Sequence, residues 1–285
     1  MSRCLLCGAG ETAQLFEKDG YPIVRCRSCG LVQVGLELDR DQLEQIYGEA
    51  YFTDEVFHDY LSERDVRVAS GAVAARALAR LVPGGRLLDV GCAAGFFLEA
   101  ASAHYDGTGV EISAFASEYA RTELGLHVLT GDITEVELGD TFDVVTLWNT
   151  IEHMADPRGA IEKIASLTRP GALLALSTGD VTGPLARRDL PNWNLMSPPY
   201  HLSFFSPRTL DLLLAGAGFG LRRIMYDGLI REGGPLASRR ARQLAAVLGF
   251  GNVMTAYAVR TATPASTSRW HRLAARYRPF GTMLP

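Results

Sequence analysis

The fold of this chain is decided by the stretch LLDVGCAAGFFLEAA, residues Leu87–Ala101. An apolar run ends in an acid, and two glycines then enclose three small residues before a helical pattern begins. Glycine tolerates the left-handed backbone of a tight turn, and its missing side chain lets a ligand come close to the peptide groups. The stretch therefore predicts a strand, a turn and a helix, with a cofactor bound against the turn.

Two common glycine turns fit this stretch poorly. A dinucleotide-binding turn has the pattern G-x-G-x-x-G, and its third glycine allows the helix to pack closely on the strand. The matching positions here are Gly91, Ala93 and Phe96, so a nicotinamide or flavin site is disfavoured. No Gly-Lys-Ser/Thr follows the turn, which excludes a phosphate-binding P-loop.

Strand and helix patterns alternate along most of the chain. A long helical pattern runs from about Ser62 to Leu81, and Asp156-Pro157 and Ser206-Pro207 each look like an N-cap followed by proline in the first helical turn. Such alternation predicts an α/β fold, with a doubly wound, Rossmann-like sheet of seven strands, helices on both faces and a ligand at the carboxyl ends of the strands. The expected strands are Arg86–Val90, Gly107–Ile112, His127–Thr130, Phe142–Trp148, Leu173–Ser177, Leu221–Tyr226 and Val253–Arg260.

A separate metal-binding module is expected at the N-terminus. Four of the five cysteines form two pairs, Cys4-x-x-Cys7 and Cys26-x-x-Cys29, with eighteen residues between the pairs. This spacing is typical of a zinc ribbon, in which four thiolates complete a tetrahedron and leave no open position for catalysis. Two disulfides are the alternative, which a reducing compartment disfavours. We expect a structural zinc that supplies the folding energy of this small module.

Composition limits the remaining possibilities. A chain of 285 residues with 47% hydrophobic content can bury a full-sized core and a small accessory module. No apolar run approaches the roughly 20 residues of a membrane helix, and the N-terminus lacks the apolar region of a secretory signal. We therefore expect a cytoplasmic protein with no membrane span. The net charge of −4 conceals a basic segment, because residues 221–285 hold eleven arginines and two acids.

A second acid completes the pattern that began with the glycine turn. Glu111 lies twenty residues after Gly91, at the end of the second expected strand, where a carboxylate can bind both ribose hydroxyls. Together with the turn, it resembles the cofactor site of class I S-adenosylmethionine-dependent methyltransferases. FDVVTLWNTIEHMADP (142–157) and HLSFFSPRTLDLLLAGAGF (201–219) resemble later motifs of the branch that methylates small molecules. The resemblance covers roughly residues 81–219.

The resemblance implies a set of cofactor-binding residues for S-adenosylmethionine. Asp132 in GDI matches an acid that faces the adenine amine, and Ala93 stands where many members have glycine. Asn149 and Thr150 either contact the cofactor or only close their strand, and Trp148 is expected in the core. The expected cofactor site comprises Asp89, Gly91, Cys92, Ala93, Gly95, Phe96, Glu111, Ile112, Asp132, Ile133, Asn149 and Thr150.

The long connection LPNWNLMSPPYHLSFF, residues 190–205, has few charges and many aromatic residues and prolines, as lids and binding loops do. Its segment Ser197–Tyr200 reproduces the SPPY signature of amino-methyltransferases. In those families the signature directly follows the fourth strand, so we interpret it here as a loop. His201 matches the histidine of the family's Glu-His pair, while Tyr200 replaces the glutamate, which disfavours sugar C-methylation. The catalytic candidates are His201, His153 and Tyr200, and for each histidine a packing role is the alternative.

The sequence thus predicts direct methyl transfer from S-adenosylmethionine to a small hydroxylated metabolite, with a histidine as general base. The resemblance suggests a sugar, glycan or secondary-metabolite intermediate, either free or linked to a nucleotide or another carrier. The alternatives are a nucleic-acid methyltransferase that grips phosphates with its ribbon and arginines, and a non-catalytic cofactor-binding partner. The expected domains are a zinc ribbon (1–36), a helical connector (37–80), a methyltransferase domain (81–262) and a basic tail (263–285).

Overall fold

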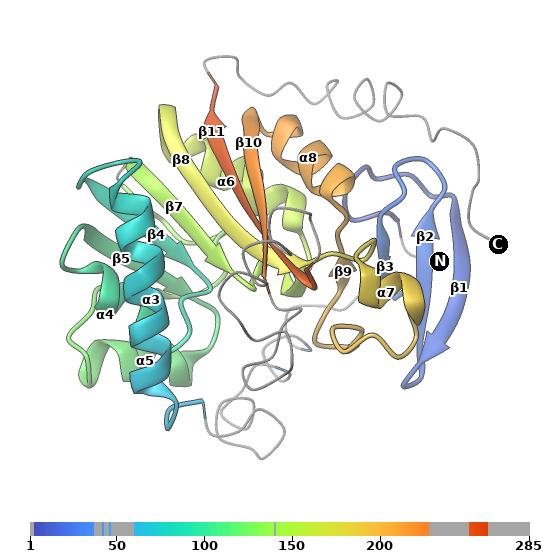
Figure 1. Ribbon diagram of the computed structural model, residues 1–285, viewed down its shortest axis with the longest axis horizontal. Coiled ribbons are helices and arrows are strands. Elements are labelled where there is room, and N and C mark those ends of the chain that lie inside the picture. Colours follow the sequence, from blue (N-terminus) through green and yellow to red (C-terminus); the bar gives the residue numbers. More distant parts are fainter. Residues whose placement is uncertain are drawn as a thin grey trace.

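The computed structural model describes residues 3–36, 42, 46, 60–139, 141–227 and 251–261. About half of the expected connector (37–41, 43–45 and 47–59), the arginine-rich segment 228–250 and the basic tail lie outside the described residues. Within the described ranges the chain forms a seven-stranded sheet flanked by helices and a smaller four-stranded sheet at one edge of the molecule (Figure 1). None of the helices in these ranges is long and apolar enough to cross a membrane.

The larger sheet confirms the predicted doubly wound architecture. Its strand order is β10-β11-β8-β7-β4-β5-β6; the five strands from β8 to β6 in that order run parallel, and β11 is antiparallel to both of its neighbours. The order reverses at β4, which has β5 on one side and β7 on the other, and such a switch point is where doubly wound sheets bind ligands. The strands are β4 (Arg86–Val90), β5 (Asp106–Glu111), β6 (Val128–Thr130), β7 (Phe142–Trp148), β8 (Thr168–Gly179), β10 (Phe219–Asp227) and β11 (Val253–Arg260).

Helices cover both faces of this sheet (Figure 1). Neighbouring strand residues face opposite sides: Leu87 packs in a buried cluster with α3, α4 and α5, whereas Leu88 packs in another with α6 and α8. The two predicted N-caps are confirmed, since the Asp156 carboxylate accepts from the Gly159 amide and Ser206 forms a capping box with Thr209. The helices are α3 (Arg64–Ala79), α4 (Phe96–Ala101), α5 (Ala114–Thr122), η2 (Ile151–His153, a single 3-10 turn), α6 (Pro157–Ser166), α7 (Pro184–Arg188) and α8 (Pro207–Gly216).

The smaller sheet contains the cysteine-bearing ribbon and one strand from far along the chain. Its order is β1-β2-β3-β9, all antiparallel, with β1 at Thr12–Lys18, β2 at Tyr21–Cys26, β3 at Val32–Val34 and β9 at Ser203–Phe204. Figure 1 shows β3 beside β9. The N-terminal ribbon is thus joined by backbone pairing to the end of the connection between β8 and α8.

The structure explains how phenylalanine is accommodated at position 96. The buried Phe96 ring stacks on Tyr60, with centroids 5.4 Å apart, and meets the edge of Tyr119. The close approach between layers occurs instead at Gly95 and at Gly109 of β5. A Cβ at Gly109 would lie 2.6 Å from Cys92 Sγ and 2.8 Å from Leu98 Cδ1. The missing side chain at Gly109 therefore allows α4 and the turn before it to lie on β5, and the missing side chain at Gly95 allows the turn to approach Ala120 of α5 and Leu126.

We predict that Gly109→Ala destabilises the protein by about 1–3 kcal/mol, because an added methyl must displace packed core atoms. Urea denaturation monitored by circular dichroism measures this free energy. Gly139→Ala is the matched control, since its Cβ would meet nothing within 4 Å; its stability should stay within about 0.5 kcal/mol. Equal effects of the two substitutions would contradict the packing role of Gly109.

Candidate active site

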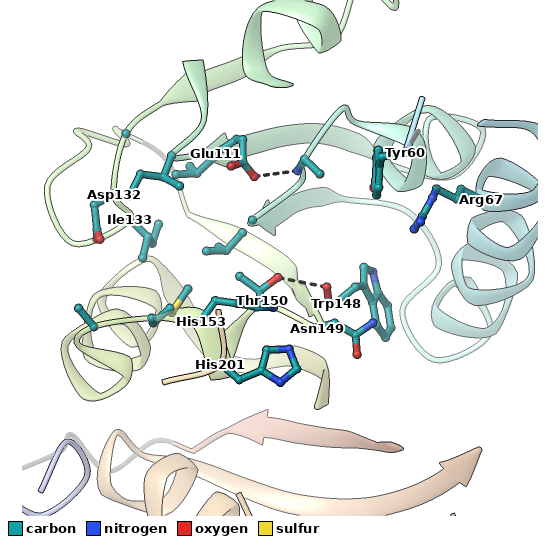
Figure 2. A pocket seen from close by; sticks show the side chains of 18 residues that line it. Tyr60, Arg67, Glu111, Asp132, Ile133, Trp148, Asn149, Thr150, His153 and His201 are labelled. Atoms are coloured by element: carbon teal, nitrogen blue, oxygen red, sulfur yellow. Dashed lines mark hydrogen bonds between the residues drawn. The ribbon is translucent and has the colours of Figure 1, made fainter. Parts of the chain in front are cut away.

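A cavity of about 370 Å³ lies at the carboxyl ends of the central strands. Tyr60 and Arg67 stand at one end and Asp132 and Ile133 at the other, while His201 lies across from Glu111 (Figure 2). The cavity brings together most of the residues that the sequence predicted for the site. These are Gly91, Ala93, Glu111, Ile112, Asp132, Ile133, Asn149, Thr150, His153 and His201.

Glu111 braces the glycine turn. Its Oε2 accepts a hydrogen bond from the Ala93 amide at 2.8 Å, and its Oε1 accepts one from the Ser113 amide at 2.9 Å. Burial raises the pKa of this carboxyl, and the backbone amides oppose the rise. Each carboxylate oxygen can accept a second bond, so Glu111 retains capacity for ligand hydroxyls.

The turn itself is shaped by left-handed residues. Gly91, Ala93 and Gly95 have φ values of 70°, 48° and 83°. For alanine the left-handed conformation is less stable by about 1–2 kcal/mol, because its Cβ approaches the following carbonyl oxygen, whereas glycine has no such clash. The bond from its amide to Glu111 offsets this cost. The turn thus presents backbone rather than side chains to the cavity.

Five of the predicted residues do not line the cavity. Asp89 lies at the buried end of β4, where Thr146 Oγ1 donates to its Oδ1 at 2.7 Å and burial raises its pKa to about 7. Cys92 is buried against Gly109, as expected of a small packing residue. The others are Gly95, Phe96 and Tyr200.

The sequence did not predict that Tyr60 and Arg67 line one end of the cavity. Arg67 of α3 holds its guanidinium over the Tyr60 ring at 3.9 Å, and its Nη2 forms an ion pair with Glu63 at 2.6 Å. The buried Arg67 Nε has no hydrogen-bond partner. A guanidinium in this position can bind a carboxylate. The sequence signal around it was only a helical pattern, which does not say which face meets a ligand.

Trp148 was expected in the core, but its side chain lines the cavity (Figure 2). Its ring meets the edge of Phe97 at 5.4 Å, and its buried Nε1 has no hydrogen-bond partner. The indole therefore supplies an apolar wall and an available donor.

His153 and His201 form a pair on the floor of the cavity, with ring centroids 4.7 Å apart. His153 Nδ1 lies 2.9 Å from the Tyr200 carbonyl oxygen, and His201 Nδ1 lies 2.7 Å from that of Leu195. A carbonyl accepts only, so each Nδ1 carries a proton and donates it. Burial lowers the pKa of His153 to about 3 and that of His201 below its usual range. Both rings are neutral at neutral pH, and the His201 Nε2 lone pair can take a proton.

Two clusters have the geometry to hold a metal ion. The sulfurs of Cys4, Cys7, Cys26 and Cys29 are buried within 4.8 Å of one another, with Cys4 to Cys29 at 3.5 Å and Cys7 to Cys26 at 3.6 Å. Tetrahedral zinc with bonds of about 2.3 Å places sulfurs about 3.8 Å apart, so these residues fit zinc. Glu152, His153 and His201 also bring ligand atoms within 4.8 Å. Burial raises the pKa of Glu152 to about 7, and its Oε2 has no partner.

The loop of residues 190–205 is fastened over the sheet by a buried polar network. Trp193 Nε1 donates to Asn252 Oδ1, and Asn252 Nδ2 donates to Asn194 Oδ1 at 2.9 Å. Asn252 directly precedes β11, so the loop is anchored to the larger sheet as well as to the ribbon.

Comparison with known proteins identifies relatives of this sequence. The sequence profile of a family described as "Methyltransferase domain" matches residues 60–223, which is more than half of the chain. Similar curated proteins include two named ubiquinone biosynthesis O-methyltransferase. That of Alkalilimnicola ehrlichii is 37% identical over 103 residues, and that of Bordetella avium is 34% identical over 109 residues. These matches cover 33% and 35% of this chain, and 42% and 45% of the relatives.

Solved structures share the fold. A Thermotoga maritima protein described as a SAM-dependent methyltransferase, possible histamine N-methyltransferase, superposes with a TM-score of 0.55 at 22% identity, covering 74% of this chain and 99% of that one. Magnesium protoporphyrin IX methyltransferase from Synechocystis with bound SAH gives 0.55 at 20% identity, covering 78% and 100%. At these identities the likeness concerns the fold.

We predict that Gly91→Ala weakens binding of S-adenosylhomocysteine by about tenfold or more, measured by calorimetric titration. Its Cβ would lie 2.3 Å from Thr150 Cγ2, so the turn must move; a loss of about 1.4 kcal/mol is tenfold in affinity. Gly125→Ala is the control, because Gly125 has a similar φ of +64° but open space at its Cβ. If Gly125→Ala weakens binding equally, backbone strain and not the close approach is responsible.

Proposed function

The chain belongs to the methyltransferase-domain family, and on this premise we propose that it transfers a methyl group from S-adenosylmethionine to a hydroxyl of a small metabolite. The supporting observation is that one cavity is lined both by Gly91, Ala93 and Glu111 and by His201, whose Nδ1 hydrogen bond to the Leu195 carbonyl leaves the Nε2 lone pair for a proton. The first part suits a nucleoside cofactor and the second suits removal of a proton from an acceptor. The curated relatives, which are named O-methyltransferases, support a hydroxyl as the acceptor group.

We place the cofactor along the cavity by matching its groups to the charges present. Arg67, at one end, would bind the amino-acid carboxylate; Glu111, in the middle, the ribose hydroxyls; and Asp132, at the other end, the adenine amine. The carboxylate, ribose and adenine lie in this order along the cofactor molecule. Asp89 does not line the cavity, so it would not contact the cofactor directly; its hydrogen bond from Thr146 would instead hold the end of β4, from which the turn begins.

The chemistry that the bound cofactor supplies is an electrophilic methyl group on a sulfonium. The chain's own residues must then orient the acceptor, exclude water and receive one proton. His201 Nε2 would take that proton from the acceptor hydroxyl as the new carbon–oxygen bond forms, while Leu195 holds the opposite ring nitrogen. Positioning contributes on the order of 7–11 kcal/mol, and a general base adds about 10²–10⁴-fold.

The acceptor side of the cavity favours a hydroxylated ring. Trp148, Met154 and Ala155 supply apolar surface, and His153 and His201 supply the polar groups. This combination fits a sugar, a glycan unit or a ring of a secondary metabolite. The four cysteines would hold a structural zinc outside this cavity. The nucleic-acid alternative rests on arginines that mostly lie outside the described residues.

The proposal is tested by incubating the protein and S-adenosylmethionine with separate panels of phenols, nucleotide sugars and primary amines, and with RNA. Mass spectrometry follows S-adenosylhomocysteine and methylated products, and nuclear magnetic resonance locates the new methyl group. We expect a methoxy product from the phenol or sugar panel. Turnover of amines or RNA alone would contradict the proposal.

We predict that the rate of methyl transfer falls on the acid side with a midpoint below about 6.5, the ordinary histidine value. The sign follows from the lowered pKa of His201: the ring stays neutral and basic until the pH drops below that pKa. His201→Gln should lower kcat by roughly 10²–10⁴-fold and remove this limb, with S-adenosylhomocysteine affinity retained. His104→Gln, at an exposed position, is the control. An unchanged acid limb in His201→Gln rules out this base.

A further inference from the structure

We propose that the four-cysteine ribbon is a positioning element of the active site, which holds His201 in the cavity by pairing with the backbone immediately after it. This inference rests on the proposed role of His201 in methyl transfer. It assigns residues 3–36 a part in acceptor turnover, although they lie outside the region that matches the methyltransferase family.

The first step is a backbone bridge through Leu202. The Val34 amide of β3 donates to the Leu202 carbonyl at 2.9 Å, and the Leu202 amide donates to the Glu152 carbonyl at 2.8 Å. The residue next to His201 is therefore held between the ribbon on one side and η2 on the other. His153, which belongs to η2, is bonded to the carbonyl of Tyr200 in the same segment.

The second step is the dependence of β9 on β3. Val32 pairs with Phe204 and Gln33 with Ser203, and β3 is the only strand that pairs with β9 among the described residues. A strand of two residues does not stand alone in water. The ribbon is thus one of the elements that set the conformation of the chain just after His201, together with η2 and Val181.

The third step leads from β3 to the metal-binding cysteines. The buried Gln33 side chain accepts from the Leu5 amide at 2.9 Å and donates to the Arg3 carbonyl at 3.1 Å, so it holds the chain on both sides of Cys4. Cys26 ends β2, and the Cys26 amide donates to the Leu31 carbonyl just before β3. A metal that fixes the cysteines therefore fixes β3.

Apolar packing follows the same route. Apolar side chains of the ribbon and of the loop form one buried cluster, whose members include Ile23, Val32, Val34, Trp193, Met196, Leu202 and Phe204. Two residues that line the cavity, Ile112 and Ala155, pack against this cluster. Figure 1 shows the ribbon strands and α7 on the same side of the molecule, next to β9. The ribbon therefore packs against the loop that forms the acceptor side of the cavity.

The hydrogen bonds that shape the cofactor side do not involve the ribbon, although the ribbon cysteines share one buried apolar cluster with Val90 and Val110 of the larger sheet. The bonds that shape the cofactor side, from Ala93 and Ser113 to Glu111 and from Thr146 to Asp89, are made within the larger sheet and its turns. Loosening the ribbon should consequently disturb residues 197–205 and acceptor turnover, and should leave cofactor binding intact.

The test compares two proline variants of the zinc-loaded, full-length chain. Val34→Pro removes the amide that donates to Leu202. Leu15→Pro places proline in the same sheet at an exposed position of β1 without a register partner, away from β9. Hydrogen–deuterium exchange of residues 197–205, calorimetric binding of S-adenosylhomocysteine, zinc content and methyl-transfer kinetics are measured for both.

We expect Val34→Pro to raise exchange of residues 197–205 about tenfold or more and to lower kcat over KM for the acceptor by a similar factor. Affinity for S-adenosylhomocysteine and the zinc content should match those of Leu15→Pro and the unaltered chain. Unchanged exchange of residues 197–205 overturns the inference. Loss of S-adenosylhomocysteine binding in parallel with turnover also overturns it, because the ribbon would then support the whole fold.

A second variant removes the metal instead of the hydrogen bond. Cys29→Ser should lose zinc and raise exchange of residues 197–205, while residues 87–96 keep their protection. Equal loss of protection in both segments counts against a local positioning role. The exchange measurement needs no turnover, so it also separates this inference from the proposed function: if His201→Gln leaves kcat unchanged, the base assignment fails even where the ribbon is shown to hold the segment.

Discussion

The proposed cofactor site depends on the two hydrogen bonds that the buried carboxylate of Glu111 accepts from Ala93 and Ser113. One bond reaches the turn after β4 and the other the turn after β5, so a single side chain fixes both backbones at the switch point of the sheet. The amides compensate for part of the cost of burying the acid, which is why its pKa is raised by burial and lowered by these donors. The hydrogen bond from the Ala93 amide to Glu111 offsets the steric cost of the left-handed conformation at Ala93.

The acceptor side is built on a different principle. Its two histidines come from segments 48 residues apart, and their rings are oriented by backbone carbonyls of the loop between β8 and α8. That loop has little secondary structure of its own and is held by neighbours: Asn252 before β11, Glu152 in η2 and Val34 in the ribbon. In the proposed arrangement, cofactor binding therefore relies on hydrogen bonds close to the switch point, and acceptor positioning relies on contacts between distant parts of the chain.

This difference explains what could be predicted from the sequence. The strands, the caps at Asp156 and Ser206 and the cofactor turn were predictable because hydrophobic pattern, capping chemistry and glycine spacing act over a few residues. The start of β8 at Thr168 was missed because Thr168-Arg-Pro-Gly looks like a turn, and its pairing with Phe142 of β7 extends the strand. Arg67 and Trp148 were not predicted to line the cavity, since a helical or apolar pattern does not reveal which side chains meet a ligand. The pairing of β3 with β9 joins segments about 170 residues apart and leaves no local signal.

The same division bears on the choice of acceptor. The family match begins at residue 60, and the chain spans less than half the length of the curated relatives it matches. The ribbon lies before that match, yet Val34 and Ile23 pack behind the loop that carries His201. Under the proposed function, a cavity whose cofactor end lies within the family match and whose acceptor end rests on an additional module can keep the reaction while changing the substrate. The family match thus supports the proposed reaction type, whereas the acceptor must be sought in the shape that the ribbon and the loop give to the other end of the cavity.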